Sequence, residues 1–493
     1  MSATIRCSVL ACAGLALAVA AAPLRAQAPL TLQDAIRLAQ QNGHDARAAR
    51  YAHEAALGRD RAFRERLFPQ LTLSGTVPQY DRSIVPVLQT DTTGNAVTLF
   101  RPEQQTTVQL GLSLTQTLPL TGGQLFVTSS LQRLDLSGQQ SSRTWSSAPF
   151  AVGIRQDIFR PNEANWDRRV QNAQLASDEQ AYLASLEDVA GQVADRYFAA
   201  YAARKGLANA EANATVNDTL YRINTGRLQV GKIGENDLLQ SQLALLRARA
   251  ALEAARLEDA RATAALRLAL GLPSDHAIEF AVTTDVPDFE PDTGIAVSEA
   301  LRNSATVSQT ALQDVQASRR VTEAQLSDGI GATLQASYGY NATASDMRTA
   351  YQNLLESRTL QVSVQMPLWQ WGAHGSSVRA AKADRDRTTE QSRSALEQLA
   401  MQAKFAALSL VQARRNLAVQ AVADSVADRR FEVAYNRYVI GRITVDNLYI
   451  AQAEKDQALL DFVAALRGYW IAYYQLRAIT LYDFVAGKPI RGA

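Results

Sequence analysis

The chain has 493 residues, with 50 lysines and arginines against 48 aspartates and glutamates, and is 47% hydrophobic. This length is sufficient for a large core or several domains. The excess positive charges, Arg6 and Arg25, lie in the first 26 residues, and the remaining charges are balanced and scattered. Such a chain lacks the basic patch that binding to nucleic acid requires, which excludes nucleic acid as a partner.

The N-terminus has the pattern of a secretory signal peptide. An apolar run over residues 9–22 follows a basic residue and is itself followed by the small residue Ala26. We place the cleavage site after Ala26 rather than after Ala28, because Pro29 as the first mature residue would constrain the scissile bond. Residues 1–26 are therefore predicted to be a signal peptide, and the protein is expected to be exported.

Both cysteines, Cys7 and Cys12, fall in this segment, so the mature chain is expected to have none. Disulfide bonds, thiol catalysis and cysteine-bound metal are thereby excluded from the mature protein. No later stretch has about 18 consecutive apolar residues, and no transmembrane helix is predicted. A mature chain that crosses a membrane would have to do so with strands.

An internal duplication organises the mature chain. Residues 222–242 align with residues 432–452 when Gly231 is placed on Gly441. The same offset aligns Arg227 with Arg437, Lys232 with Arg442, Ile233 with Ile443, and Leu238 with Leu448. Because the two segments lie almost half a chain apart, a whole structural half is duplicated.

The duplication divides the chain into two structural repeats. The first repeat is expected over residues 27–271 and the second, with a short C-terminal tail, over residues 295–493. Residues 272–294, which are rich in proline and acidic side chains, are predicted to be a linker between them. Each repeat is expected to contain a helix, strands and two further helices.

Long, narrow apolar stripes indicate coiled-coil helices. One such stripe, with alternating spacings of three and four residues, comprises Leu396, Leu399, Ala403, Ala406, Leu410, Ala413 and Leu417. No proline interrupts residues 162–225 or 375–438. At about 1.5 Å per residue, each stretch can form a rod of roughly 100 Å, far longer than a globular domain needs.

Strand patterns occur in equivalent windows of the two repeats, over 70–77 and 150–158 and over 333–340 and 359–366. Apolar side chains alternate there with mostly Gln, Thr, Ser and Gly. A soluble sheet over a core would show the same alternation. The composition of the polar face, together with the adjoining long helices, favours strands with lipid on one side and water on the other.

These features, in their order and duplication, resemble the TolC-like outer-membrane efflux proteins, also called outer membrane factors. The matching motifs are Leu32-x-x-Ala35, Leu-Phe-Pro-Gln-Leu at 67–71, Gln-Asp-Ile-Phe at 156–159, Met-Pro-Leu at 366–368, the duplicated Arg-x-x-x-Gly turns, and Gly271-Leu272-Pro273. Each motif is weak by itself, but together they cover essentially the whole mature chain.

The resemblance implies an α+β membrane protein with internal duplication. In this family a trimeric transmembrane β-barrel continues as a long periplasmic α-helical coiled-coil barrel. It also implies a place in the outer membrane, with a periplasmic adaptor protein and an inner-membrane pump of RND, ABC or MFS type as partners. The expected function is a passive exit duct of a tripartite efflux or type I secretion system, with no cofactor.

One departure from the family pattern of two strands per repeat is an extra hairpin over residues 106–133. Apolar alternation over 106–118 and 124–133 flanks a Thr-Gly-Gly turn. If the hairpin joins the barrel, as we expect, each chain supplies about six strands and the trimer about 18. The alternatives are an outer loop or a segment within the lumen.

The resemblance also implies a gate at the periplasmic tip of the helices, closed by acidic rings and polar links between helices. Asp446 takes the position of one ring aspartate, whereas Tyr449 stands where a second acid occurs in the family. Three copies of Asp446 around an axis would favour cations. The alternative is an exposed carboxylate that interacts only with the dipole of its helix.

The tip turns are candidates for contact with the adaptor. Gly231 and Gly441 suit tight turns between antiparallel helices, and Arg227 and Arg437 precede them. The turn geometry follows from the residues, whereas the adaptor role follows from the resemblance alone. Arginines that are merely solvated are the alternative.

Catalytic signatures are missing. The histidines, His44, His53, His276 and His374, have no metal-ligand spacing, and the chain has no nucleophile elbow, phosphate loop or dinucleotide fingerprint. Neither an enzyme nor a metal site is predicted. The competing function class is an exported coiled-coil adaptor or adhesin without a pore.

Overall fold

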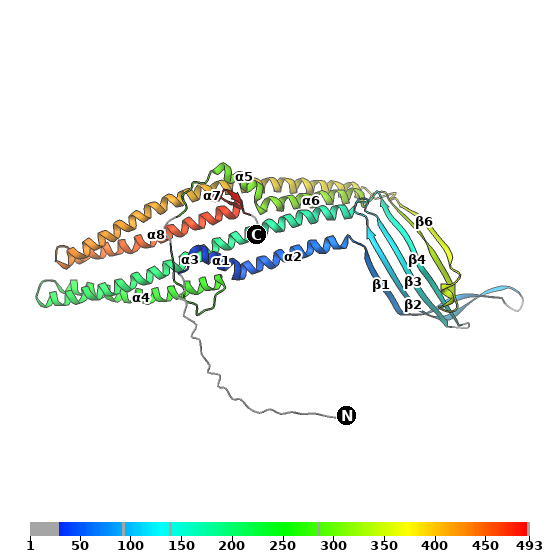
Figure 1. Cartoon of the computed structure of the whole chain (residues 1–493), viewed down its shortest axis with the longest axis horizontal. Helices are drawn as coiled ribbons and strands as arrows, with labels where there is room; N and C mark the ends of the chain where they lie inside the picture. Colours follow the sequence, from blue (N-terminus) through cyan, green and yellow to red (C-terminus); the bar gives the residue numbers. More distant parts are fainter. Residues whose placement is uncertain (1–28, 91–93, 138–140, 283–285, 491–493) are drawn as a thin grey trace, which may run out of the picture.

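The computed structural model describes residues 29–90, 94–137, 141–282 and 286–490. The predicted signal peptide and its cleavage site lie outside these ranges. The described chain is elongated, with a large sheet at one end and mostly helices over the rest (Figure 1). None of the helices in these ranges combines the length and hydrophobicity needed to cross a membrane.

The helices follow the duplication. They are α1 (Leu32–Asn42), α2 (His44–Arg66), α3 (Glu163–Gln229), α4 (Glu235–Leu270), α5 (Thr293–Asn303), α6 (Ala305–Leu326), α7 (Ala373–Val439) and α8 (Val445–Thr480). Helices α3 and α7 have 67 residues each, and α4 and α8 have 36 each. Equal lengths at equivalent places are what duplication of a whole half produces. The longest helices reach roughly 100 Å at about 1.5 Å per residue.

Local chemistry explains where the helices begin and break. The Thr31 side chain accepts a hydrogen bond from the Asp34 amide at the start of α1, and Asp292 accepts from two amides at the start of α5. Gly43 separates α1 from α2, where a Cβ would lie 2.5 Å from the carbonyl oxygen of Ala39. Only glycine therefore fits this break.

Six of the strands form one antiparallel sheet in the order β1-β2-β3-β4-β5-β6. They are β1 (Gln70–Thr90), β2 (Ala96–Thr117), β3 (Gln124–Ser137), β4 (Ser142–Ile158), β5 (Gly331–Ala344) and β6 (Leu355–Gln365). The hairpin expected over 106–133 lies within this sheet as parts of β2 and β3. The two repeats meet where β4 pairs with β5.

The first two strands are longer than the sequence pattern predicted. Strand β1 continues past residue 77 to Thr90, and β2 begins at Ala96 rather than at 106. Pro78, Pro86 and Pro102 interrupt the alternation in these extensions. Because β1 is an edge strand, its prolines remove hydrogen-bond donors that a central strand would need.

One face of the sheet is apolar and exposed in the single chain. Leu71, Leu73, Leu360 and Val364 are between 66% and 75% exposed. A soluble sheet would cover such a face with a core. Here the polar side chains at the alternate positions point to the opposite face of the sheet. Strands with lipid on one side and water on the other require this arrangement.

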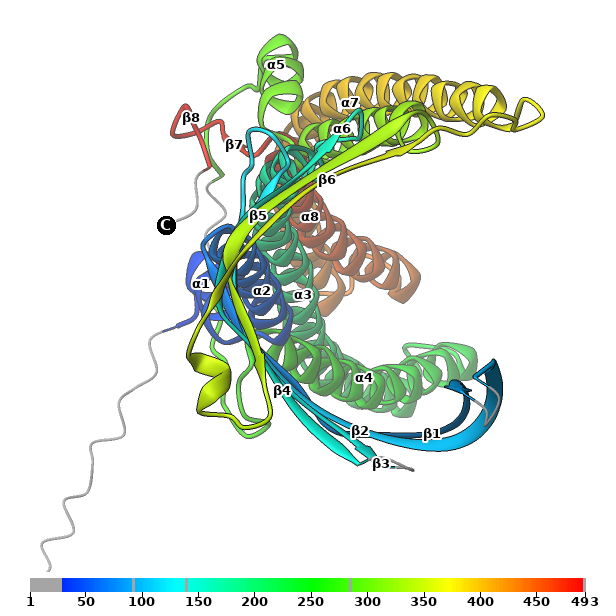
Figure 2. The same ribbon diagram turned by 90° about the vertical axis from the view of Figure 1, so that its right-hand side faces the viewer.

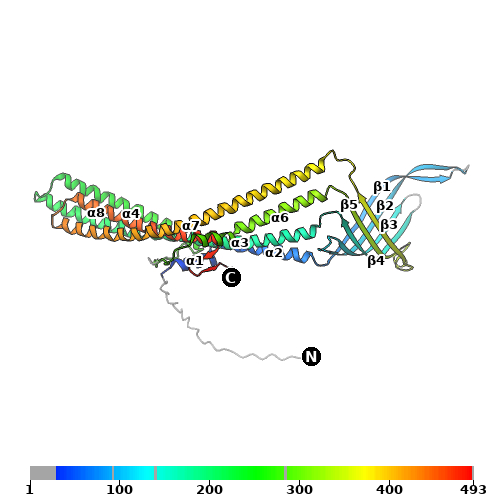
Figure 3. The same cartoon turned by 90° about the horizontal axis from the view of Figure 1, so that it is seen from above.

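The main core lies at mid-length (Figure 3), where α1, α5 and residues 272–282 and 286–289 pack against the long helices. Tyr197 and Phe198 of α3 are fully buried in the same core as Leu466 and Tyr469 of α8. The Tyr197 hydroxyl donates to the carbonyl oxygens of Leu30 and Ala281 at 2.8 and 3.2 Å. This core fixes α3 against α8 and so sets the positions of both helical tips.

A buried ion cluster adjoins this core. Arg477 of α8 donates to both carboxylate oxygens of Glu187 in α3, at 2.8 and 3.1 Å. It also donates to Asp483, in the short strand β7 (Tyr482–Asp483) that pairs with β8 (Lys488–Pro489), at 2.8 Å. Burial alone would lower the pKa of Arg477, but Glu187 outweighs it and raises the pKa above its ordinary value. The cluster thus joins α3, α8 and the C-terminal tail.

Candidate functional site at the helical tip

The two tip turns have the same geometry. After α3, the Lys232 amide donates to the Arg227 carbonyl at 2.9 Å, and after α7 the Arg442 amide donates to the Arg437 carbonyl at 2.8 Å. Gly231 and Gly441 occupy the left-handed region, with φ of 68° and 73°. This is the Schellman arrangement, which glycine adopts without strain. The predicted turns are therefore equivalent in structure as well as in sequence.

The two arginines of the turns differ in their surroundings. Arg227 is half-buried and donates to the backbone oxygens of Tyr438 and Val439, both at 3.3 Å, with its guanidinium 5.1 Å from the Tyr438 ring centre. The Arg437 side chain is exposed and forms no hydrogen bond or ion pair with the described residues. Arg227 thus joins the two tips within the chain, whereas Arg437 is free to contact another protein.

A buried polar network lies directly behind the turns. The Tyr438 hydroxyl donates to Asn224 Oδ1 at 2.7 Å, and the Asn224 amide donates to the Ser241 hydroxyl at 2.7 Å. Leu220 and Leu448, which are fully buried, pack beside it. The network connects α7, α3 and α4, so the two helical hairpins form one packed tip.

The predicted gate residues lie at the start of α8. Asp446 is exposed in the first turn and accepts a hydrogen bond from Gln240 of α4. The Tyr449 hydroxyl is buried and lacks a hydrogen-bond partner among the described residues. Burial, followed by the nearby Tyr438 and Asp446, raises the pKa of Tyr449 to about 12. Tyr449 is therefore neutral at physiological pH and adds no second negative charge beside Asp446.

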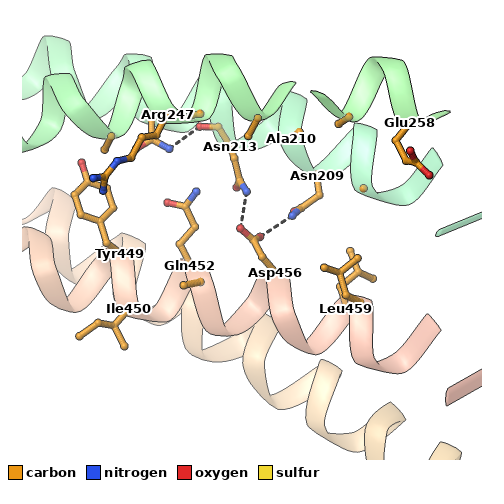
Figure 4. Close-up of a pocket in the computed structure, with 18 of the residues that line it drawn as sticks. Asn209, Ala210, Asn213, Arg247, Glu258, Tyr449, Ile450, Gln452, Asp456 and Leu459 are labelled. Carbon is orange, nitrogen blue, oxygen red and sulfur yellow. Dashed lines mark hydrogen bonds between the residues drawn. The ribbon is translucent and has the colours of Figure 1, made fainter. Parts of the chain in front are cut away.

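A groove of about 1070 Å³ runs from Asp446 along the helices, between α4 and α8 and over α3. Alanines of all three helices line much of it, and they allow close approach of another group. Across the groove, Asn209 and Asn213 of α3 donate to the two oxygens of Asp456 in α8, at 2.6 and 2.7 Å (Figure 4). This link joins the two helical hairpins well behind their tips.

The same groove contains unpaired polar atoms. Besides the Tyr449 hydroxyl, Asn217 Oδ1 and Gln452 Oε1 are buried without a hydrogen-bond partner among the described residues. Groups of this kind are satisfied by water or by a neighbouring molecule. The sequence carries one sign of this site, namely asparagines at 209, 213 and 217, which lie on one helical face.

The comparisons with known proteins agree with this architecture. Residues 124–272 match the model of the outer membrane efflux protein family. Protein CyaE of Bordetella pertussis is 26% identical over 238 residues, which are 48% of this chain and 50% of CyaE. The chain thus spans about half the length of this curated relative.

Solved outer-membrane proteins share the fold over almost the whole chain. The Campylobacter jejuni CmeC channel has a TM-score of 0.68 at 16% identity, over 94% of this chain and 87% of CmeC. The Vibrio cholerae protein VceC has a TM-score of 0.65 at 14% identity, over 93% of this chain and 97% of VceC. The resemblance to the TolC-like outer-membrane efflux proteins is confirmed.

The match to the outer membrane efflux protein family gives the molecule its orientation. The protein lies in the outer membrane, and its helices extend into the periplasm. The strand end is therefore the membrane end, and the tip with Asp446 is the periplasmic end. Trp369 and Trp371, which are 72% and 89% exposed, lie between β6 and α7, at the level where membrane and periplasm meet.

Within the described residues, no group of three or more His, Cys, Asp or Glu side chains is arranged to hold a metal ion. The polar groups at the helical tip are instead arranged between helices. These groups form hydrogen bonds between helices and set the local charge.

Replacing Asp456 by alanine is expected to loosen the tip. The substitution removes two charge-assisted hydrogen bonds, each of which contributes about 1.5–3 kcal/mol. Amide hydrogen exchange in the facing segments of α3 and α8 should therefore become at least about tenfold faster. Asp461→Ala is the matched control, because Asp461 accepts only from Gln457 of its own helix. Equal exchange in both variants would contradict a role of Asp456 in joining the hairpins.

Proposed function

We propose that the protein is the exit duct of a tripartite efflux or type I secretion system, a passive conduit from periplasm to exterior. The observation that carries this proposal is the continuity, within one chain, of an exposed apolar sheet and helices of 67 residues. The sheet crosses the outer membrane and the helices cross the periplasmic space. No step of bond chemistry is needed, so the protein acts as a channel rather than as an enzyme.

The open edges of the sheet support the trimer that the resemblance implies. Strands β1 and β6 are its two edges, and each has unpaired backbone groups that hydrocarbon cannot satisfy. Pairing of β1 in one copy with β6 in the next closes a barrel, and three copies supply about 18 strands. The curvature of sheet and helices is consistent with one sector of such a ring (Figure 2).

The decisive experiment is imaging of the protein extracted from outer membranes in mild detergent. We expect a hollow particle with threefold symmetry, well over about 100 Å long. A map at strand resolution should contain about 18 barrel strands, because β2 and β3 lie within the sheet. A map with about 12 strands would reject the inclusion of the extra hairpin. A solid rod, or release by osmotic shock, would favour an exported adaptor or adhesin without a pore.

The partners follow from the same proposal. A passive duct needs an energised inner-membrane pump of RND, ABC or MFS type, and a periplasmic adaptor to seal the junction with the tip. Arg437, Gly441 and the equivalent Gly231 are at the surface of the tip, where an adaptor would arrive. Arg227 would act indirectly, by holding the two turns together.

Charge reversal at the exposed arginine tests the adaptor contact. Arg437→Glu should reduce chemical cross-linking to the adaptor at least about fivefold, as loss of about 1 kcal/mol of attraction produces, and leave the trimer intact. Arg415→Glu is the matched control, since Arg415 is exposed on the same helix, about 33 Å from Arg437. Normal cross-linking of Arg437→Glu would remove Arg437 from the adaptor interface.

A further inference from the structure

The hairpin of β1 and β2 is longer than the sheet to which it belongs. Strand β2 pairs with β3 only from Gln104 to Thr117, although its pairing with β1 continues to Ala96. Residues 83–90 and 96–103 therefore form a two-stranded extension, here called the distal hairpin. At about 3.3 Å per residue it projects roughly 25 Å past the last pair with β3. Figures 1 and 3 show it beyond the ends of the other strands.

The distal hairpin has one strongly apolar face. Ile84, Leu88 and Phe100 are 70%, 73% and 73% exposed. Phe100 pairs with Pro86, between Ile84 and Leu88, so strand alternation places these side chains on the same face. A two-stranded ribbon with such a face is not stable alone in water and needs a cover.

Lipid does not cover this apolar face, because a cluster of charged side chains lies between the distal hairpin and the rest of the sheet. Arg133 and Arg143 donate to the two oxygens of Asp135 at 2.8 and 2.7 Å. Asp135 pairs with Thr106 of β2, before the distal hairpin begins. Since charged side chains are costly in hydrocarbon, this level marks the outer end of the lipid-facing band. The apolar face beyond it therefore requires protein.

In the proposed ring, the neighbouring copy supplies the protein that covers the distal hairpin. In the proposed ring, β6 of the next copy runs beside β1, but β6 has 11 residues and β1 has 21. Both strands adjoin the helices, at Gln70 and Gln365, so β6 extends only to about Tyr80 of β1. Beyond that point lies the segment 345–354 of the next copy, which connects β5 to β6.

This connecting segment is ordered and partly apolar. The Ser147 hydroxyl of β4 donates to the carbonyl oxygen of Ala350, which is fully buried, and Asp346 accepts from the Thr349 amide. Met347 and Tyr351 are 49% and 42% exposed. In Figure 2 the distal hairpin and the segment 345–354 stand at opposite ends of the curved sheet. In the proposed ring, the β6 edge of one copy adjoins the β1 edge of the next, which brings these two ends of the sheet near each other.

We propose that the distal hairpin docks on the segment 345–354 of the neighbouring copy and interlocks the outer rim of the trimer. The contact uses the unpaired edge of β1 beyond β6 and covers the apolar face with apolar side chains of the segment. It rests on the trimer of the proposed function, but it is a separate contact from the pairing of β1 with β6.

Paired cysteines test this contact, because both native cysteines lie in the predicted signal peptide. One variant combines Leu88→Cys with Met347→Cys at the rim, and a second combines Thr72→Cys with Ser363→Cys at the β1–β6 edge. Both are treated with a flexible thiol cross-linker in outer membranes and resolved on a denaturing gel. We expect covalent dimers and trimers from both variants.

The remaining outcomes separate the two proposals. Cross-linking at the edge without cross-linking at the rim would overturn the docking and leave the trimer standing. Absence of cross-linking in both variants would overturn the trimer, and with it the docking. Cross-linking at the rim alone would reject the pairing of β1 with β6 on which the docking depends.

Lysine substitutions on the distal hairpin provide a second test of the docking. Ile84 and Leu88 are exposed in the single chain, so the double variant Ile84→Lys/Leu88→Lys should fold and insert normally. We expect its trimers to dissociate at a lower temperature than wild-type trimers on native gels of heated samples. An unchanged dissociation temperature would overturn the docking, because lysines at a dry apolar contact weaken it.

Discussion

Arg477→Ala is expected to lower the free energy of unfolding by about 3–5 kcal/mol. The substitution leaves Glu187, which is only 6% exposed, as an unpaired buried charge next to Asp188. It also frees Asp483 and the C-terminal tail from α8. Loss of helical circular dichroism on heating in detergent should therefore occur at a clearly lower temperature than in the wild-type protein.

The chain contains a matched control for this effect. Arg467 of α8 also forms an ion pair with an acid of α3, Asp195, but the two side chains are 44% and 40% exposed. An exposed pair of this kind contributes about 0–1 kcal/mol. Similar destabilisation by Arg467→Ala and Arg477→Ala would contradict the importance of burial at Glu187.

Asp446→Asn is expected to reduce the cation selectivity of the channel. In the proposed trimer, three copies of this carboxylate surround the axis at the periplasmic tip. Removal of about 1 kcal/mol of attraction for a permeating cation corresponds to roughly a fivefold lower ratio of cation to anion permeability. Reversal potentials of single channels under a salt gradient measure this ratio directly.

Two further variants isolate the charge of Asp446 from its hydrogen bond. Gln240→Ala removes the donor to Asp446 and keeps the charge, so its selectivity should remain that of the wild-type channel. Glu397→Gln removes an exposed acid of α7 far from the tip. An unchanged reversal potential in Asp446→Asn would leave Asp446 as a helix-start carboxylate without a role in selectivity.

The elements themselves could be predicted because their signals are local. The stripe from Leu396 to Leu417 lies within α7, with Leu399, Ala403, Leu410 and Leu417 buried. The alternation over 359–366 corresponds to β6, and both glycine turns adopt the expected left-handed conformation. In each case the evidence lies within a few residues, where spacing alone determines which side chains share a face.

The extensions of β1 and β2 could not be predicted in the same way. Their prolines and charges break the alternation, and only the edge position of β1 makes them acceptable. Position in a sheet depends on pairing with other strands. The sequence pattern of one strand does not contain that information.

The side-chain contacts of the site could not be predicted from the sequence either. Arg227 was expected at the surface for an adaptor, and its contact with Tyr438 depends on how α3 packs against α7. The link of Asp456 to Asn209 and Asn213 joins helices that are more than 200 residues apart. Small changes in helix register would separate such pairs.

The sequence by itself determined the duplication, the long helices, the membrane strands and the turn glycines, because periodicity and residue type act locally. Only the tertiary structure decided which polar residues meet in the groove, where the buried charge of Glu187 finds Arg477, and how far the distal hairpin extends. The physical reason is that these contacts depend on the relative register of distant elements, which is set by packing of the whole chain.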